Sequence, residues 1–355
     1  MSWRLLLVVA MVIAAPGARG AAAAGKAVTI QGNKVLFGGQ PVKLWGVRVG
    51  SAAASDEYAQ QLVETLKFFK DHGVNTIAVS YQGSAGQVQR VFAADGKSFA
   101  DTAARDRMRT IIEAAARRDM VVIVGLFHPR KMGTNSEDPR LESREAYVEA
   151  TRTAATELKQ YRNVILSVAH DAGRTAWAGA PIKFAPEDAV ACLKAAAAAA
   201  PDLPRGCGGP EHDFNAAVAA APEASVILHG ERTPAPPAFR EAKPVINVCL
   251  FGADAGGRDV QGVWPPQQRD RFAEAIARHL GQEAHHMVAH FPGWHEGGLD
   301  LRKNRFDVGG AGTTKDPGTA WYYQTLLRKV TPAAPAVVGG PAHGKPATRE
   351  SIFQE

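Results

Sequence analysis

The sequence predicts a (β/α)8 TIM barrel with a small N-terminal β-hairpin. Between Lys26 and Lys329, short apolar runs rich in β-branched residues alternate with longer, alanine-rich amphipathic stretches. Runs that are apolar throughout indicate strands buried on both faces, which is typical of a parallel sheet covered by helices. Eight such β–α units fit the usual size of a closed barrel. A doubly wound open sheet is the alternative, but no Gly-x-Gly-x-x-Gly follows the first strand.

The elements of this barrel are predicted in chain order. The chain opens with a hairpin, in which strands at 28–30 and 35–37 flank the turn residues Gly32 and Asn33. We expect the barrel strands at residues 42–49, 74–81, 120–127, 164–169, 205–208, 225–228, 245–251 and 286–291. We expect the helices at residues 57–72, 105–118, 145–161, 187–200, 267–280 and 319–328. Gly73 ends the first helix, because glycine readily adopts the positive φ found after a helix C-terminus.

The two ends of the chain are expected to lie outside the barrel. Arg4 precedes an apolar run over residues 5–15, and small residues follow it. This pattern predicts a signal peptide over residues 1–24 and export to the periplasm or the cell exterior. The run is shorter than the roughly 20 residues that a membrane-spanning helix needs. Residues 330–355 are rich in Pro, Ala and Gly and are predicted to be a disordered tail, which leaves residues 25–329 for the barrel domain.

The composition excludes several other classes of protein. With 46% hydrophobic and 21% charged residues in a chain of 355, neither a disordered nor a fibrous protein fits. The net charge of +6 is spread thinly, without the basic stripes of nucleic-acid binders, so no nucleic-acid partner is expected. Three cysteines are too few for a disulfide scaffold; Cys192 and Cys207 either pair or remain buried thiols. Nothing in the sequence requires a cofactor, and the oligomeric state is left open.

The candidate site lies at the carboxyl ends of the strands, which form the working face of such barrels. Polar residues that follow an apolar strand are better placed for ligand contact than for packing. They are His128 after the third strand, His170 and Asp171 after the fourth, His229 and Glu231 after the sixth, Asp254 after the seventh, and His290, Trp294 and Glu296 after the eighth.

These segments and their order resemble the cellulase-like glycoside hydrolases of clan A, family 5 and its neighbours. The likeness extends from Val28 to about Lys329. QGNKVLFGGQPVKLWGVRV is similar to the family's hairpin and strand one with its Gly-Val-Asn, and LKFFKDHGVNTIAVSY to its passage into strand two. NVILSVAHDA looks like the strand-four signature Asn-Val-Ile…Ala-Asn-Glu-Pro, ASVILHGE like strand six, KPVINVCLFG like strand seven and FPGWHEGG like strand eight. The resemblance implies a barrel that binds carbohydrate, in a class that hydrolyses O-glycosyl bonds.

The departures from the family pattern fall on the catalytic residues. Family members use two carboxyl groups about 5 Å apart, one as acid/base and one as nucleophile. At the acid/base position, His170-Asp171 replaces the family's Asn-Glu, and the Asp carboxyl group is one methylene shorter. The nucleophile position falls on Cys249 or Leu250, and neither carries a carboxylate. The strand-two Arg that usually holds the nucleophile is Ala78 here.

The sugar-facing positions of the family are better preserved. His128, His229 and Trp294 stand where the resemblance places ring-stacking and hydroxyl contacts, and the strand-end residues His290 and Glu296 are further candidates. We therefore expect a barrel that binds oligo- or polysaccharide at its mouth but lacks the usual cleavage chemistry.

An active glycosidase remains open as an alternative. Its catalytic candidates are Asp171 as the acid with the adjacent His170, and Glu231, Asp254 or Glu296 in place of the missing base. Inverting enzymes tolerate carboxyl groups about 6.5–9.5 Å apart, which leaves room for such a displaced partner.

A metal-dependent hydrolase is the second alternative. Histidines at the ends of strands three, four, six and eight, with Asp171 beside them, could converge on one divalent ion. No His-x-His spacing supports a metal site, however. His285 and His286 are adjacent in a strand and should point to opposite faces, so at most one of them could take part.

Overall fold

The computed structural model describes residues 25–83, 89–129, 141–173, 177, 180–209, 211–229, 242–248, 264–281, 285–291, 310–311, 313–316 and 318–330. The strands of its barrel are β4 (Trp45–Arg48), β5 (Thr76–Ser80), β6 (Val121–Phe127), β7 (Val164–Ala169), β8 (Arg205–Cys207), β9 (Val226–His229), β10 (Val245–Asn247) and β11 (His285–His290). A separate small sheet consists of β1 (Val28–Gln31), β2 (Lys34–Phe37) and β3 (Gln40–Pro41). The described helices are α1 (Asp56–Asp71), α2 (Thr102–Ala116), α3 (Arg144–Leu158), α4 (Pro186–Ala199), α5 (His212–Ala220), α7 (Pro266–Leu280) and α9 (Ala320–Val330).

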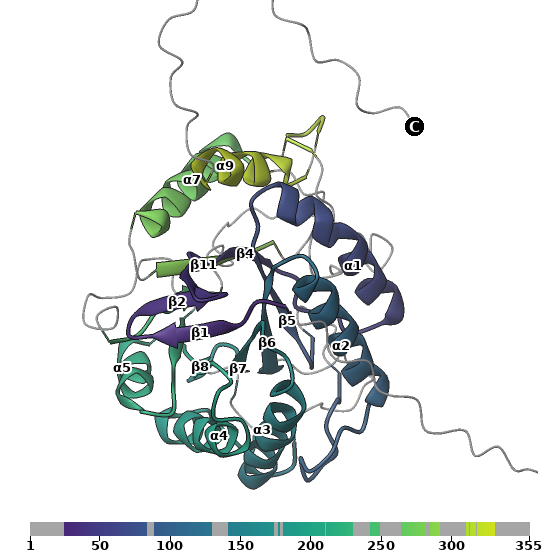
Figure 1. Cartoon of the computed structure of the whole chain (residues 1–355), viewed down its shortest axis with the longest axis vertical. Helices are drawn as coiled ribbons and strands as arrows, with labels where there is room; N and C mark the ends of the chain where they lie inside the picture. The colour runs from purple at the N-terminus through teal and green to yellow at the C-terminus, as the bar shows by residue number, and fades with distance from the viewer. Residues whose placement is uncertain are drawn as a thin grey trace, which may run out of the picture.

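The predicted (β/α)8 fold is confirmed. The barrel closes in the order β10-β11-β4-β5-β6-β7-β8-β9, and the described strand pairs within it are parallel. The helices surround the strands, with α7 and α9 side by side on one flank (Figure 1). Among the helices that the structure describes, none combines the length and apolar character needed to cross a bilayer. The expected signal peptide and all but the first residue of the expected tail lie outside the described residues.

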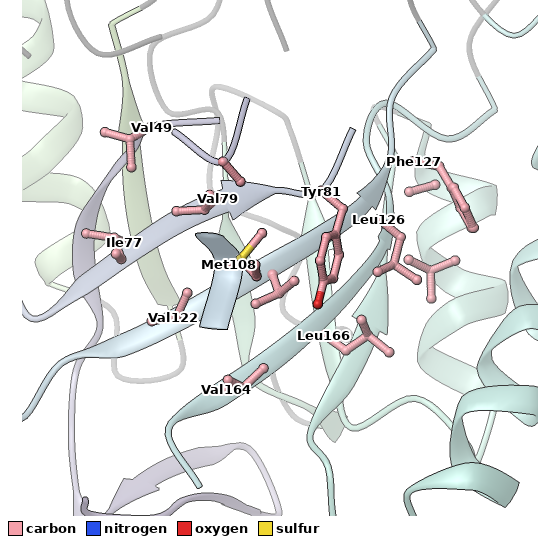
Figure 2. Close-up of a cluster of buried hydrophobic side chains, with 14 of the residues drawn as sticks. Val49, Ile77, Val79, Tyr81, Met108, Val122, Leu126, Phe127, Val164 and Leu166 are labelled. Atoms are coloured by element: carbon pink, nitrogen blue, oxygen red, sulfur yellow. The ribbon is translucent and has the colours of Figure 1, made fainter. Parts of the chain in front are cut away.

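The barrel strands are buried on both faces, as their unbroken apolar runs predict. In β6, Val121 and Ile123 belong to the cluster that fills the barrel interior, whereas Val122 and Val124 pack in the layer between strands and helices. Figure 2 shows part of this outer layer, where Val122 lies near Met108 of α2. Because alternate residues face the two layers, a polar side chain at an inward position has to be accommodated inside the barrel or at its mouth.

The N-terminal hairpin closes the end of the barrel opposite the mouth. Val28 and Val35 pack in the same cluster as the interior side chains of the barrel. The backbone N–H of Val28 donates to the carbonyl of Arg162, which lies just before the amino end of β7, at 2.7 Å. The hairpin therefore covers the amino ends of the strands, and a ligand reaches the barrel from their carboxyl ends.

Helix α1 begins and ends as its sequence indicates. The Ser55 hydroxyl accepts a hydrogen bond from the backbone N–H of Tyr58, which caps the first turn. Gly73 follows the helix with a φ of +84°, and a Cβ there would lie 2.7 Å from Val330 at the end of α9. Glycine is thus required both for the turn and for the docking of the last helix against the first.

Two elements differ from the sequence-based expectations. Helix α5 was not predicted, because its nine residues bury only Phe214, Asn215 and Val218 and its alanine-rich sequence carries little amphipathic contrast. The third strand of the hairpin sheet, β3, is only two residues long and fully exposed. The remaining helices and strands lie within a few residues of their predicted bounds.

Candidate functional site at the barrel mouth

Arg48 brings a positive charge to the mouth of the barrel from the end of β4. Its register partner on β5 is Ala78, and its partner on β11 is His290. The residue is only 4% exposed. Its guanidinium group reaches across the mouth to the ends of β6 and β7, where Nη1 lies 2.8 Å from Nε2 of His170 and Nη2 lies 3.5 Å from Nε2 of His128. One side chain therefore joins three strand ends.

His128 and His170 form a stacked pair beside this guanidinium group. Their ring centroids are 5.2 Å apart and the ring planes are inclined by 16°. The backbone N–H of His128 donates to Oε1 of Gln82 at 3.2 Å, and the backbone N–H of His170 donates to the carbonyl of Phe127 at 3.0 Å. These contacts fix the backbone that carries both imidazoles.

Asp171 adjoins the histidine pair and sits in a backbone conformation that non-glycine residues rarely adopt. Its φ is +50°, a left-handed conformation that Asp tolerates better than most residues. The indole N–H of Trp177 donates to the carbonyls of both His170 and Asp171, at 3.2 and 3.1 Å. Oδ2 of Asp171 lies 3.5 Å from Nε2 of His170, and these two side chains are 21% and 16% exposed. The backbone that carries the carboxyl group is therefore fixed, and the side chain itself is partly exposed.

His229 has different neighbours. Its register partner on β10 is Asn247, whose amide nitrogen lies 3.3 Å from Nε2 of His279 on α7. Burial, together with the nearby His279, lowers the pKa of His229 to about 4, so the imidazole is neutral at physiological pH. His229 thus lies with Asn247 on the face turned toward α7, and its role as a sugar contact stays a prediction.

His290 lies on the strand next to Arg48. Because the two are register partners in parallel strands, their side chains leave the sheet on the same face. Glu231, Trp294 and Glu296 lie outside the described residues, as do Asp254, Cys249 and Leu250. The structure therefore brings together three of the predicted site residues: His128, His170 and Asp171.

The adjacent histidines of β11 point to opposite faces, as their position in a strand predicts. Nδ1 of His286 accepts a hydrogen bond from the backbone N–H of Leu44 at 2.9 Å. The ring of His285 lies 5.8 Å from that of His279 on α7. Within the described ranges, no group of three or more His, Cys, Asp or Glu residues is arranged to hold a metal ion.

Cys192 and Cys207 are free and buried. Burial raises the pKa of both thiols to about 12. Both therefore stay protonated and unreactive at physiological pH, which corresponds to the buried-thiol interpretation of the sequence.

Comparisons with known proteins agree with the fold. Residues 35–199 match the family model of cellulase (glycosyl hydrolase family 5). A β-glucanase from Saccharophagus degradans in complex with cellotetraose superposes with a TM-score of 0.59 at 11% identity, over 89% of this chain and 98% of that one. A β-mannanase from the blue mussel Mytilus edulis gives 0.54 at 13% identity, over 87% and 98%. A family 5 glycoside hydrolase from Bacteroides vulgatus gives 0.56 at 17% identity, over 79% and 67%. No curated protein matches the sequence.

A closed parallel barrel with polar side chains gathered at the carboxyl ends of its strands is the architecture of a (β/α)8 barrel with a candidate ligand site at its mouth. Over residues 35–199 the chain is similar to the cellulases of glycosyl hydrolase family 5, and solved glycoside hydrolases share its barrel fold. The resemblance seen in the sequence is thereby confirmed.

Three residues of the site were missed from the sequence: Arg48, Gln82 and Trp177. The sequence did mark Arg48, because it is a charged residue at the end of an otherwise apolar strand. It stands two positions after Gly46, so the two residues lie on the same face of that strand. Gln82 and Trp177 act through the backbone of His128 and Asp171, and no local pattern marks such contacts.

Proposed function

We propose that this protein is an exported, cellulase-like barrel that binds oligo- or polysaccharide at the carboxyl ends of its strands. The observation that supports binding is the convergence of Arg48, His128, His170 and Asp171 at one end of the barrel. Guanidinium and imidazole N–H groups donate hydrogen bonds and a carboxylate accepts them, which matches the alternating donor and acceptor character of sugar hydroxyls.

Cleavage by the family's double displacement is not part of this proposal. That reaction needs a carboxylate nucleophile about 5 Å from the acid/base group. The sequence has Cys or Leu at the nucleophile position and Ala78 where the supporting arginine of the family stands. The side chain of Asp171 is also one methylene shorter than the family's glutamate, which moves its proton away from the glycosidic oxygen.

The binding proposal is tested by titrating the protein with cello- and manno-oligosaccharides and measuring affinity by calorimetry. These are the first probes because the similar structures include a β-glucanase with cellotetraose and a β-mannanase. Asp171→Asn should weaken binding about tenfold, the size expected for one charge-assisted hydrogen bond. Asp213→Asn, on the exposed surface of α5, is the matched control and should bind like the wild type. Failure to bind any glycan of a broad array would refute the proposal.

An active glycosidase with relocated carboxylates is the competing function, and Asp171 favours it because Trp177 fixes its backbone and its carboxyl group is partly exposed at the mouth. Glu231, Asp254 or Glu296 would supply the second carboxyl group. Turnover of aryl glycosides separates the two functions. Hydrolysis that is lost in Asp171→Asn, with inversion at the anomeric carbon seen by NMR, would establish the enzyme and overturn the binding-only proposal.

Export is proposed on the sequence of residues 1–24. Expression of the full chain in a bacterial host, followed by N-terminal sequencing of periplasmic and medium fractions, tests it. We expect a mature protein that begins between residues 20 and 25. An intact Met1 in the cytoplasmic fraction alone would contradict export.

A further inference from the structure

Helices α7 and α9 lie side by side on the outer flank of the barrel (Figure 1), with a groove of about 620 Å³ between them. Both helices run from the mouth toward the opposite end of the barrel. The carbonyl of Leu280, the last residue of α7, accepts from Nζ of Lys43 at 2.6 Å, and Val330, the last residue of α9, lies against Gly73. Lys43 and Gly73 precede the amino ends of β4 and β5. The groove on this flank is therefore separate from the candidate site at the mouth.

One face of α9 forms the first wall of the groove. Its members recur every three or four residues, which places them on the same face of the helix; they are Trp321, Gln324, Thr325, Arg328 and Lys329. Gln324, Arg328 and Lys329 are exposed, whereas Trp321 is buried. Trp321 and Lys329 stand eight positions apart, which is about 12 Å along the helix axis. A wall of this length can contact more than a single small anion.

Arg269 on the second wall places a positive charge where the helix itself disfavours one. It lies in the first turn of α7, and a cation there opposes the helix dipole. Its Nη1 donates to the carbonyl of Ala311 at 2.6 Å, which holds the guanidinium group in position. Arg328 and Lys329 differ, because they lie in the last turn of α9, where the helix dipole favours cations. Arg269 is thus the cation of the groove that helix stability does not explain.

The charges of the groove are not balanced within it. Among the described residues that line the groove, Asp270 alone carries a negative charge. None of the three cations forms an ion pair with another residue in the described part of the chain. The hydroxyl of Thr325 donates to the carbonyl of Trp321 at 2.6 Å and accepts from Nη2 of Arg328 at 3.5 Å, which ties this guanidinium group to the wall. The groove therefore presents an excess of positive charge to solvent.

We propose that the groove between α7 and α9 is a second carbohydrate site, which binds an acidic oligosaccharide through its carboxylate groups. Guanidinium groups match carboxylates in shape and charge, and the amide of Gln324 offers a donor and an acceptor to sugar hydroxyls. Asp270 offsets one of the positive charges, which suits the widely spaced carboxylates of an acidic sugar better than the dense phosphates of a nucleic acid. That the ligand is a saccharide rests on the proposed function.

The experiment is calorimetry of the full chain with oligogalacturonate and with its methyl ester, which keeps the sugar rings but removes their negative charges. We expect the wild type to bind the acidic form, more weakly as salt is added. The double variant Arg328→Gln with Lys329→Gln changes only exposed side chains, and it should weaken this binding at least tenfold. Its affinity for the methyl ester should equal that of the wild type. Arg269→Gln should also weaken binding of the acidic form about tenfold, and Arg269→Lys should weaken it less because the charge is kept.

The matched control is the double variant Lys159→Gln with Lys194→Gln. It removes the same charge from two exposed side chains of another part of the helical layer, at the end of α3 and on α4. This variant should bind oligogalacturonate like the wild type. An equal loss of affinity in the two double variants would overturn the proposal, because the net charge of the protein rather than the groove would then attract the ligand.

Two further probes identify other ligands of the groove. Inorganic phosphate that competes at the groove as tightly as oligogalacturonate would show a site for small anions only and would overturn the saccharide assignment. Vesicles containing phosphatidylglycerol test a membrane surface. If the protein binds these vesicles through Arg328 and Lys329 but does not bind oligogalacturonate, the proposal is likewise overturned.

The groove and the mouth can fail independently. If no neutral oligosaccharide binds, but oligogalacturonate binds and is lost in the Arg328 and Lys329 variant, the function proposed for the mouth fails and the groove site stands. If neutral oligosaccharides bind and Asp171→Asn weakens them, while oligogalacturonate does not bind, the groove site alone fails.

Discussion

His286 should make the barrel unstable in acid, and the effect can be worked out from its surroundings. The side chain lies on β11 and is 2% exposed, and its Nδ1 accepts from the backbone N–H of Leu44. Burial, followed by the nearby Lys43 and His285, lowers its pKa to about 3. Protonation would break the bond to Leu44 and place a charge inside the barrel.

The magnitude follows from linkage. The unfolded chain binds a proton at His286 below a pKa of about 6.5, whereas the folded chain does so only near 3. The contribution of His286 to the free energy of unfolding is thus fully present above pH 6.5 and is lost as the pH falls toward 3. Each pH unit in that window corresponds to roughly 1.4 kcal/mol, so between pH 7 and pH 4 the free energy of unfolding decreases by about 3 kcal/mol. This is a large part of the total stability of a typical domain.

Urea denaturation at several pH values between 7 and 4, followed by circular dichroism, measures this loss. His286→Asn keeps an acceptor near the position of Nδ1 but cannot be protonated. The variant should be less stable than the wild type at pH 7, because it leaves a cavity, yet its stability should fall less by about 3 kcal/mol between pH 7 and pH 4. His212→Asn, at a side chain that is 63% exposed, is the control and should keep the wild-type slope. Equal slopes for His286→Asn and the wild type would refute the reasoning.

Other substitutions test the packing of the barrel and the strain at its mouth. A Cβ at Gly46 would lie 2.0 Å from the carbonyl oxygen of Thr76, so Gly46→Ala should lower the free energy of unfolding by about 3 kcal/mol or more in denaturant unfolding. Gly281→Ala is the control: its added Cβ would lie 3.4 Å from the nearest atom, so it should change stability by less than about 0.5 kcal/mol. Tyr322→Phe removes the hydroxyl that donates to the Gly46 carbonyl at 3.0 Å and should cost about 1–2 kcal/mol; an unchanged midpoint would contradict it. Asp171→Gly should raise the free energy of unfolding by up to about 1 kcal/mol, because glycine accepts a φ of +50°. The same variant should lose sugar binding. A destabilised variant would show that the contacts of the carboxyl group outweigh the backbone strain.

Most of the fold could be predicted because its signals are local. The strand at Val164–Ala169 was predicted with its observed bounds, since a short apolar run between polar residues has few other interpretations. Gly73 marks the end of α1 through a backbone conformation that its own side chain permits. Helix α5 was missed because its burial depends on β8 and β9, which lie next to it only in the folded chain.

Only those site residues that directly follow a strand could be predicted from the sequence. His128, His170 and Asp171 follow their strands directly, so the fold alone places them at the mouth. The contacts between them depend on side chains from other strands, and Arg48 lies 122 residues from His170 in sequence. His229 shows the same limit, because the face on which it lies is set by its register with Asn247.

The pairing of Arg48 with Ala78 bears on any attempt to build the catalytic residue pattern of family 5 into this scaffold. Neighbouring strands are about 4.8 Å apart, so an arginine introduced at position 78 would begin beside the one already at position 48. Two guanidinium groups there would repel each other and compete for the same space. Engineering would therefore have to exchange residues rather than add them, with Arg48→Asn and Ala78→Arg made together before a glutamate is placed on the seventh strand.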